Sequence, residues 1–320
     1  MSTGEKFLQL LIVIGLFLAV MAVVLVLTSR VRSRVGEMLQ TTAFLLPAVL
    51  LLALGLLYPA IRTVIESFRD RTSSEWVGLA NYEAIFTDDA LLQVLRNTAI
   101  WVLVTPVLAT VIGLVYAVLV DRARFERFAK ALMFMPMAIS LVGASLIWRF
   151  VYSYRETDAA QIGVLNQLLK SLGFETYRFI STEPWNTLFL VVVMIWVQAG
   201  FAMTILSAAI KAVPDDIVEA ARLDGVSGWR MFRYITVPSI RPSLIVVLTT
   251  ITIATLKVFD IVRTMTGGNF GTSVLAYEFY AQGFRAFNNG LGAALAVLLF
   301  VLVIPIVIYN VRQMRKVEAR

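Results

Sequence analysis

The chain has 320 residues, of which 59% are hydrophobic and 15% are charged, and its mean hydropathy is +0.81. Soluble domains are about 45–50% apolar, so one soluble core cannot bury this much hydrocarbon, whereas a bilayer can. The chain contains no Cys and no His. That composition excludes disulfides, thiolate or imidazole metal sites, catalytic cysteines and Ser-His-Asp triads. The composition predicts a membrane protein with several spans.

Seven uncharged apolar runs are each close to the ~20 residues that cross the hydrocarbon of a bilayer. In chain order they are 7–27, 43–60, 98–120, 131–148, 187–210, 243–256 (with a continuation past Lys257 towards Ile261) and 291–309. Backbone groups in lipid must be satisfied within the segment, and these runs lack the alternation of barrel strands. The first run is longer than the apolar part of a signal peptide, so we expect a retained helix. The sequence predicts an all-α integral membrane protein with about seven transmembrane helices.

The polar loops fall into two sets that differ in charge. The loops 28–41, 121–130, 211–241 and 312–320 hold 16 Lys/Arg and 8 Asp/Glu. The alternate loops, 1–6, 61–96, 153–184 and 262–288, hold 10 Lys/Arg and 12 Asp/Glu. Because basic loops stay in the cytoplasm, we expect the N-terminus outside and the C-terminus in the cytoplasm. The net charge of +7 is then a topology signal, and we expect no nucleic-acid partner.

The loop 211–241, between the fifth and sixth runs, has the pattern of two short helices. Pro214 with Asp215 or Asp216 begins the first helix, with the acids at its positive end. Gly225 ends this helix at a position that favours a left-handed residue. Ser227 can cap the second helix, which we expect to stop before Pro238.

A helix pair of this size is compatible with a DNA-reading helix-turn-helix, but the residues favour a protein partner. The loop is tethered by apolar runs at both ends, and its second helix carries Trp229, Phe232 and Tyr234 with only two arginines. Ala220 and Ala221 permit close packing on the first helix. We expect this amphipathic pair to dock into a groove on a protein.

The loop also resembles a known family. Glu219-Ala220-Ala221, then Gly225, then after nine residues Ile235-x-Val237-Pro238, is similar to the coupling-loop signature of permease subunits of binding-protein-dependent ABC importers. The one departure is Val237, where leucine is usual. The preceding stretch 211–216 resembles sugar-importer permeases of the maltose and glycerol-phosphate type. Two further stretches resemble the same permease family: 78–86 with 96–98, before its core helices, and 259–269 with Thr272, after its coupling loop.

The resemblance implies a six-helix type I importer domain at 42–312 with a coupling loop at 211–241. An extra helix and linker would occupy 1–41, and a cytoplasmic tail 313–320. The implied ATPase-coupling residues are Glu219, Ala220, Ala221, Gly225, Ile235 and Pro238.

The resemblance also implies the partners. They are a second, similar permease, two cytoplasmic ATPase subunits, an extracytoplasmic solute-binding protein and the lipid of a bacterial or archaeal cytoplasmic membrane. The chain has no Gly-x-x-x-x-Gly-Lys-Ser/Thr phosphate loop. We therefore expect no enzyme activity and no cofactor in this chain, with ATP and Mg²⁺ bound by the partner ATPase.

Two other classes of function are alternatives for a chain with several apolar runs. A self-contained secondary transporter or channel would place ionisable residues inside its spans and often has inverted repeats. Here only Lys257 and Asp260 lie within a run, with Arg149 at the end of another, and no repeat is evident. A membrane-embedded enzyme would need clustered acid, base or metal-ligand residues, and the remaining carboxylates do not cluster.

Candidate substrate-pathway residues lie in the fifth and sixth runs: Trp196, Gln198, Phe201, Thr250, Lys257 and Asp260. Sugars stack on aromatic rings and bind amide, carboxylate and ammonium groups. Helix packing is the alternative for each residue, including the neighbouring Thr249, Thr252 and Thr255. The resemblance places substrate between the fourth, fifth and sixth spans, which favours Gln198 and Phe201. Lys257 and Asp260 are three residues apart, so on one helix they would share a face and pair.

Overall fold

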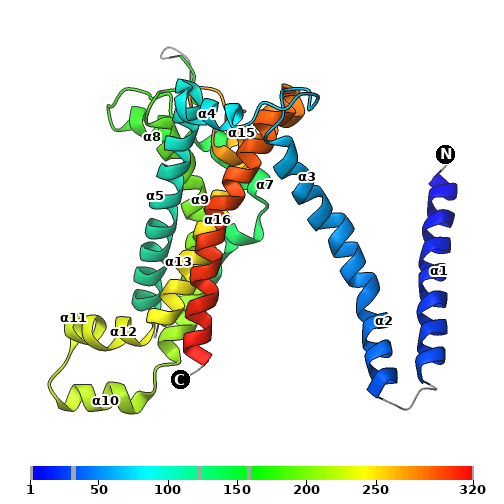
Figure 1. The fold of residues 1–320 in the computed structure, drawn as a ribbon. Helices are drawn as coiled ribbons and strands as arrows, with labels where there is room; N and C mark the ends of the chain where they lie inside the picture. The colour runs from blue at the N-terminus through cyan, green and yellow to red at the C-terminus, as the bar shows by residue number, and fades with distance from the viewer. Residues whose placement is uncertain (1–2, 30–33, 122–123, 157–159, 319–320) are drawn as a thin grey trace. The chain divides into compact units, whose positions relative to one another are not determined.

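The computed structural model describes residues 3–29, 34–121, 124–156 and 160–318. Within these ranges the elements are helices, and the only bridge between extended segments is the isolated pair Arg69 and Trp76. The all-α class is therefore confirmed. The chain divides into two compact units, residues 1–65 and 66–320 (Figure 1).

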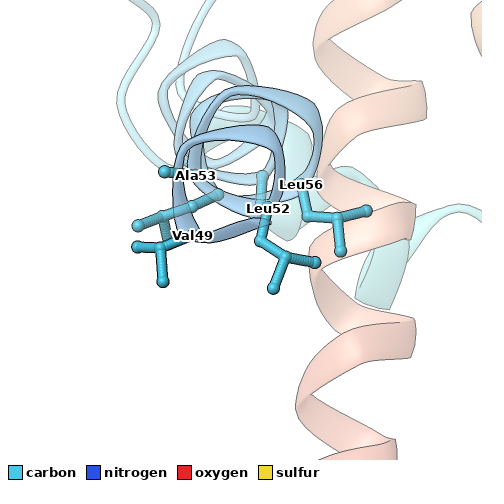
Figure 2. A pocket seen from close by; sticks show the side chains of 6 residues that line it. Val49, Leu52, Ala53 and Leu56 are labelled. Carbon is cyan, nitrogen blue, oxygen red and sulfur yellow. The ribbon is translucent and has the colours of Figure 1, made fainter. Parts of the chain in front are cut away.

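The first unit consists of two helical runs. Helix α1 (Thr3–Ser29) contains the first apolar run, and α2 (Arg34–Leu52) continues through a π-helical turn, η1 (Ala53–Leu57), into α3 (Tyr58–Glu66). Figure 2 shows Val49, Leu52, Ala53 and Leu56 on one side of this second run. With Leu57 and Ala60 they border an open groove of about 530 Å³. Because all six lining side chains are apolar, this face suits lipid tails or another apolar helix.

The second unit contains the remaining elements. In chain order they are α4 (Ala80–Thr87), α5 (Asp89–Val120), α6 (Glu126–Phe134), η2 (Met135–Ala138), α7 (Leu141–Val151), α8 (Val164–Ser171), α9 (Asn186–Lys211), α10 (Asp215–Leu223), α11 (Gly228–Met231), η3 (Phe232–Thr236), α12 (Val237–Ser239), α13 (Arg241–Leu256), α14 (Asp260–Met265), α15 (Leu275–Tyr280), η4 (Ala281–Arg285) and α16 (Asn289–Glu318). The long helices α5, α9, α13 and α16 form a bundle, with α10 to α12 at one end and α4, α8 and α15 at the other (Figure 1).

Four helical runs are long and apolar enough to cross a membrane: 44–66, α5, α9 and 289–313 of α16. Among the described residues, two bent helix pairs also pass this test when their halves are taken together, which gives up to six candidate spans. Residues 126–138 meet 141–151 at 102°, and residues 228–239 meet 241–256 at 70°. The expectation of one continuous helix over 131–148 is therefore wrong. The chain turns because η2 ends at Ala138, and Ser140 starts α7 by accepting a hydrogen bond from the Gly143 N–H at 3.1 Å.

The most extensive helix contact in the bundle is between α5 and α9. A Cβ on Gly113 of α5 would lie 2.6 Å from the Cβ of Ala202 and 2.6 Å from the backbone nitrogen of Met203. Only hydrogen fits at that position. Small residues permit this backbone approach, and dispersion contacts then hold helices together in lipid, where the solvent is as apolar as the side chains. The α5–α9 pair thus forms the rigid centre on which the functional segments are mounted.

Candidate coupling surface and transport pathway

The first helix of the coupling loop forms as the sequence predicts. Helix α10 follows Pro214, carries Asp215 and Asp216 in its first turn, and ends at Leu223. Gly225 has φ +77°, and the Val226 N–H donates to the Ala221 carbonyl at 2.9 Å. This left-handed ending satisfies the last carbonyls of the helix. A Cβ on Gly225 would meet nothing within 4 Å, so the space beside it is open.

The second helix differs from the prediction in two ways. It does not stop before Pro238 but runs from Gly228 to Ser239, through the π-helical turn η3, and bends at Ile240. The wide turn just before Pro238 loosens the backbone where a proline ring would otherwise collide with a preceding carbonyl. Ser227 occupies the N-cap position, but its side chain makes no capping hydrogen bond.

The two helices project at the end of the bundle (Figure 1), and they expose large apolar side chains. The exposed fraction is 90% for Leu223, 72% for Trp229 and 70% for Tyr234. Phe232 is half-buried, and its ring centre lies 5.1 Å from that of Trp229. Exposed side chains of this size are typical of a surface that is covered by a partner.

Some of the six predicted coupling residues lie on this exposed surface, and the others pack within the loop beneath it. Glu219, Ala220, Gly225 and Pro238 are exposed, whereas Ile235 is half-buried and Ala221 is buried. Ala221 therefore packs within the loop, and its carbonyl holds the turn at Val226. The exposed members are the ones that can touch another protein directly.

A polar cluster that the sequence did not predict joins α5, α6 and α9 next to the loop 211–241. The Lys130 Nζ lies 2.5 Å from Asp121 Oδ1 and 2.8 Å from Glu126 Oε1. Ser207 donates to the same Asp121 oxygen at 2.8 Å and contacts Lys130, while Lys211 pairs with Glu126. We call these five residues the root cluster, because Lys211 is the last residue of α9 before the coupling loop.

The root cluster supports the loop while leaving a hollow beneath it. A cavity of about 370 Å³ is lined by Asp121 and Lys211 on the bundle side and by Arg222 and Phe232 on the loop side. The i,i+4 spacing of Glu126 and Lys130 was a signal available in the sequence. The partners from α9 were not visible there, because Ser207 is 77 residues from Lys130 and Lys211 is 85 residues from Glu126.

In the predicted pathway, the aromatic residues of α9 belong to the packed core. The Trp196 ring lies 5.8 Å from the Trp148 ring of α7 in an edge-to-face arrangement. Trp196 and Phe201 are both half-buried against the main hydrophobic cluster. Gln198 differs, because it is half-buried and no hydrogen bond joins its amide to any other described residue. An amide left open inside a span is available to a polar solute.

The threonines of α13 separate into two groups. Thr249, Thr252 and Thr255 each donate to a carbonyl one turn earlier, at 2.7–2.8 Å. Such bonds satisfy the hydroxyl inside the helix and agree with a packing role. Thr250 is exposed and makes no hydrogen bond among the described residues. Of the four hydroxyls, only that of Thr250 remains open to a ligand.

The expected pairing of Lys257 with Asp260 is wrong. Helix α13 ends at Leu256 and α14 begins at Asp260, so the two residues do not share one helix and the sixth span does not continue to Ile261. Among the described residues no ion pair joins them. At the break Val258 is buried, and the centre of the Phe259 ring lies 5.1 Å from that of Tyr280.

The break leaves Lys257 exposed and Asp260 half-buried. Arg149 of α7, which the sequence analysis noted at the end of a run, donates to the Thr264 carbonyl at 3.2 Å and so ties α7 to α14. Among the described residues, no hydrogen bond, ion pair or ring contact joins Gln198 or Thr250 to Lys257 or Asp260. The candidate pathway residues are thus separate accessible groups, with no direct bond between them.

Comparisons with known proteins agree with this arrangement. Residues 93–318 match the family described as "binding-protein-dependent transport system inner membrane component". The chain is 46% identical over 275 residues to the osmoprotective compounds uptake permease protein GgtC of Synechocystis sp., covering 86% of this chain and 99% of that protein. It is 45% identical over 280 residues to the alpha-glucoside transport system permease protein AglF of Rhizobium meliloti, covering 87% and 83%.

A solved structure shows the same fold. The crystal structure of a bacterial ABC transporter involved in the import of the acidic polysaccharide alginate superimposes with a TM-score of 0.76 at 20% identity, covering 89% of this chain and 99% of that chain. Partners of such a component are, in kind, a binding protein and an ABC ATPase. The chain belongs to the family of binding-protein-dependent transport system inner membrane components, as the permease subunit of an ABC importer and not as an enzyme.

Proposed function

We propose that this permease forms half of the translocation pathway of an importer for small neutral glycosides, with α-glucosides as the first substrates to test. The relatives named for alpha-glucosides and osmoprotective compounds, each more than 40% identical, support this class of substrate. The open groups Gln198 and Thr250 support it chemically, because neutral amide and hydroxyl groups bind sugar hydroxyls.

The observation that carries the transport role is the coupling loop. Its two helices expose Glu219, Ala220, Gly225 and the rings of Trp229 and Tyr234 at one end of the bundle. We propose that this surface enters the cleft of a cytoplasmic ATPase. Two ATPase subunits, a second and similar permease, and an extracytoplasmic binding protein complete the complex. ATP and Mg²⁺ are bound by the ATPase subunits.

The proposed orientation follows from the same loop. If the coupling loop meets a cytoplasmic ATPase, the C-terminus is also cytoplasmic and the N-terminus faces outside, as the charge bias of the loops predicts. The membrane is then the cytoplasmic membrane of a bacterium or archaeon. The end of the bundle with α4, α8 and α15 faces the binding protein.

Reconstitution tests the proposal. The permease pair, the ATPase and the binding protein are placed in liposomes, and uptake of radiolabelled maltose, sucrose and trehalose is measured. We expect uptake that requires ATP and the binding protein, together with binding-protein-stimulated ATP hydrolysis. Uptake driven by an ion gradient without ATP would instead identify a secondary transporter. Absence of uptake for all three glycosides would contradict the proposed substrate class.

A further inference from the structure

A second polar cavity lies at the opposite end of the bundle from the coupling loop. It has a volume of about 400 Å³, within the range of small-molecule sites. Its polar lining comes from the start of α5, the loop 266–274 and the segment 278–282. The polar side chains are Asp88, Gln93, Asn97, Ser273, Glu278 and Gln282, and the apolar ones include Leu91, Val94 and Leu291.

One wall of this cavity is a loop held in a fixed conformation. The Asn97 amide donates to the carbonyls of Gly271 at 2.6 Å and Ser273 at 2.9 Å, and Asn186 of α9 donates to the Phe270 carbonyl at 2.6 Å. Gly271 has φ +60°, and a Cβ there would collide with the side-chain amide of Gln93. The wall is therefore built before any ligand arrives, which reduces the entropy that binding must overcome.

The cavity presents hydrogen-bond acceptors that have no partner. Asn97 is only 5% exposed, and both of its N–H groups are used, but its Oδ1 has no hydrogen bond among the described residues. Gln93 Oε1, Gln282 Oε1 and Asp88 Oδ2 likewise have no hydrogen bond among the described residues, and Gln93 and Asp88 are exposed. These four oxygens are accessible rather than sealed inside the fold, so each can accept a hydrogen bond from a ligand that enters the cavity.

The charges around the cavity restrict the class of ligand. Glu278 accepts from Gln282 and Ser273 at 2.7 Å each, and Asp88 accepts two backbone N–H groups at the start of α5. None of the described residues that line the cavity is cationic. Two carboxylates repel an anion, whereas the hydroxyls of a neutral sugar can donate to the open acceptors and its C–H face can rest on the leucine and valine side chains.

We propose that this cavity is a binding subsite for a neutral, polyhydroxylated solute, occupied before the solute enters the span. The proposal rests on the proposed function and deepens it, because it adds a binding position and a preference for uncharged over phosphorylated or sulfonated sugars. The side-chain oxygens of Asn97, Gln93 and Gln282 accept hydrogen bonds from the sugar hydroxyls, and the loop at Gly271 forms one wall of the subsite.

The absence of native cysteine allows a direct test. Gln93→Cys places a thiol at the cavity, and Gln167→Cys places one on exposed α8 outside it as a matched control. The permease–ATPase complex in nanodiscs, without nucleotide or binding protein, is labelled with an impermeant maleimide. We expect excess maltose to slow labelling of Gln93→Cys about threefold, as two-thirds occupancy implies, and to leave Gln167→Cys unchanged. Glucose 6-phosphate should give no protection.

A second variant tests whether the lining residues cause the protection. Gln282→Leu in the Gln93→Cys background should abolish protection by maltose, whereas Gln167→Leu in that background should preserve it. The inference is overturned if labelling of Gln93→Cys is equally fast with maltose, sucrose and trehalose, or if calcium chloride protects and the sugars do not. Uptake by the unmodified complex is measured in parallel. Failure of that uptake contradicts the proposed function, while intact uptake without protection contradicts only this subsite.

Discussion

A single carboxylate oxygen, Asp121 Oδ1, lies 2.5 Å from the Lys130 Nζ and so ties the C-terminal end of α5 to α6. An acidic side chain at a helix C-terminus meets the negative end of the helix dipole, which is unfavourable unless a cation is close. The Asp121 side chain is only 8% exposed, so water does little to screen it. Lys130 therefore supplies the cation that compensates this carboxylate at the root of the coupling loop.

Removing Lys130 should destabilise this end of the bundle. Lys130→Met removes the cation that Asp121 and Glu126 share, and we expect a loss of about 3 kcal/mol, typical of a broken buried pair. The thermal midpoint of the purified complex measures the effect. Lys130→Arg keeps the positive charge and serves as the control, and we expect it to lower the thermal midpoint less than Lys130→Met does. An unchanged midpoint in Lys130→Met would show that the root cluster contributes nothing to stability.

The charge of the coupling surface can be tested at Gly225 with two variants of the same shape. Asn and Asp both tolerate the left-handed conformation that φ +77° requires. We expect Gly225→Asp to insert normally but to lose most substrate-stimulated ATP hydrolysis, since it adds a charge to a protein contact. Gly225→Asn should retain most of it. Equal hydrolysis in both variants and in the unmodified complex would mean that the loop is a connector.

Charge reversal provides a second test of the same surface. Glu219 is exposed on α10 and projects from the bundle end that carries the loop. We expect Glu219→Lys to weaken co-purification of the ATPase while leaving the thermal midpoint of the permease unchanged. Glu75→Lys, an exposed acid at the other end of the second unit, is the matched control and should bind ATPase normally. Loss of ATPase from both variants would indicate a general effect of charge.

Topology can be read from single cysteines in this cysteine-free chain. We expect Glu219→Cys to be protected from an impermeant maleimide in intact cells and to react after permeabilisation. Gln167→Cys on α8 should react in both conditions. The expectation follows from the loop charges, which place 211–241 in the cytoplasm and 153–184 outside. Labelling of Glu219→Cys in intact cells would reverse the orientation.

The helix break at Lys257 separates Lys257 from Asp260, so we expect mutations of the two residues to affect uptake independently. Because no ion pair joins them, the effects of Lys257→Met and Asp260→Asn on kcat/KM of uptake should add to within about 0.5 kcal/mol. The double variant completes the cycle. An interaction energy well above that value would show that the two side chains pair during transport, as the sequence pattern first suggested.

Close packing of α5 on α9 predicts an unusual response to alanine. In most helices Gly→Ala stabilises by up to about 1 kcal/mol. Gly113→Ala should instead destabilise by about 1–3 kcal/mol, because its Cβ overlaps Ala202 and Met203. Gly55→Ala, where a Cβ meets nothing within 4 Å, is the control. A higher thermal midpoint in Gly113→Ala would contradict this contact.

The sequence alone determined the class of the protein and the position of its coupling loop. Hydropathy over about 20 residues and the glycine turn at Gly225 depend only on residues that are neighbours in the sequence. Both can therefore be recognised without knowledge of the fold. The prediction of helices therefore held for α5, α9 and α16. It failed at Ile139-Ser140 and at Lys257, where the chain remains apolar on both sides of a break. Hydropathy does not register a bend when the backbone turns inside an apolar environment.

Tertiary structure decided the sites that combine distant segments. Asn97 and Gly271 are 174 residues apart, yet their hydrogen bond builds one wall of the polar cavity. Lys130 and Ser207 likewise meet across 77 residues at the root cluster. Polar side chains such as these produce no periodic pattern in the sequence. Their roles depend on which donor lies beside which acceptor once the helices have packed. Burial then makes each partner matter, because an amide or carboxylate removed from water must find its hydrogen bonds within the fold or in a ligand.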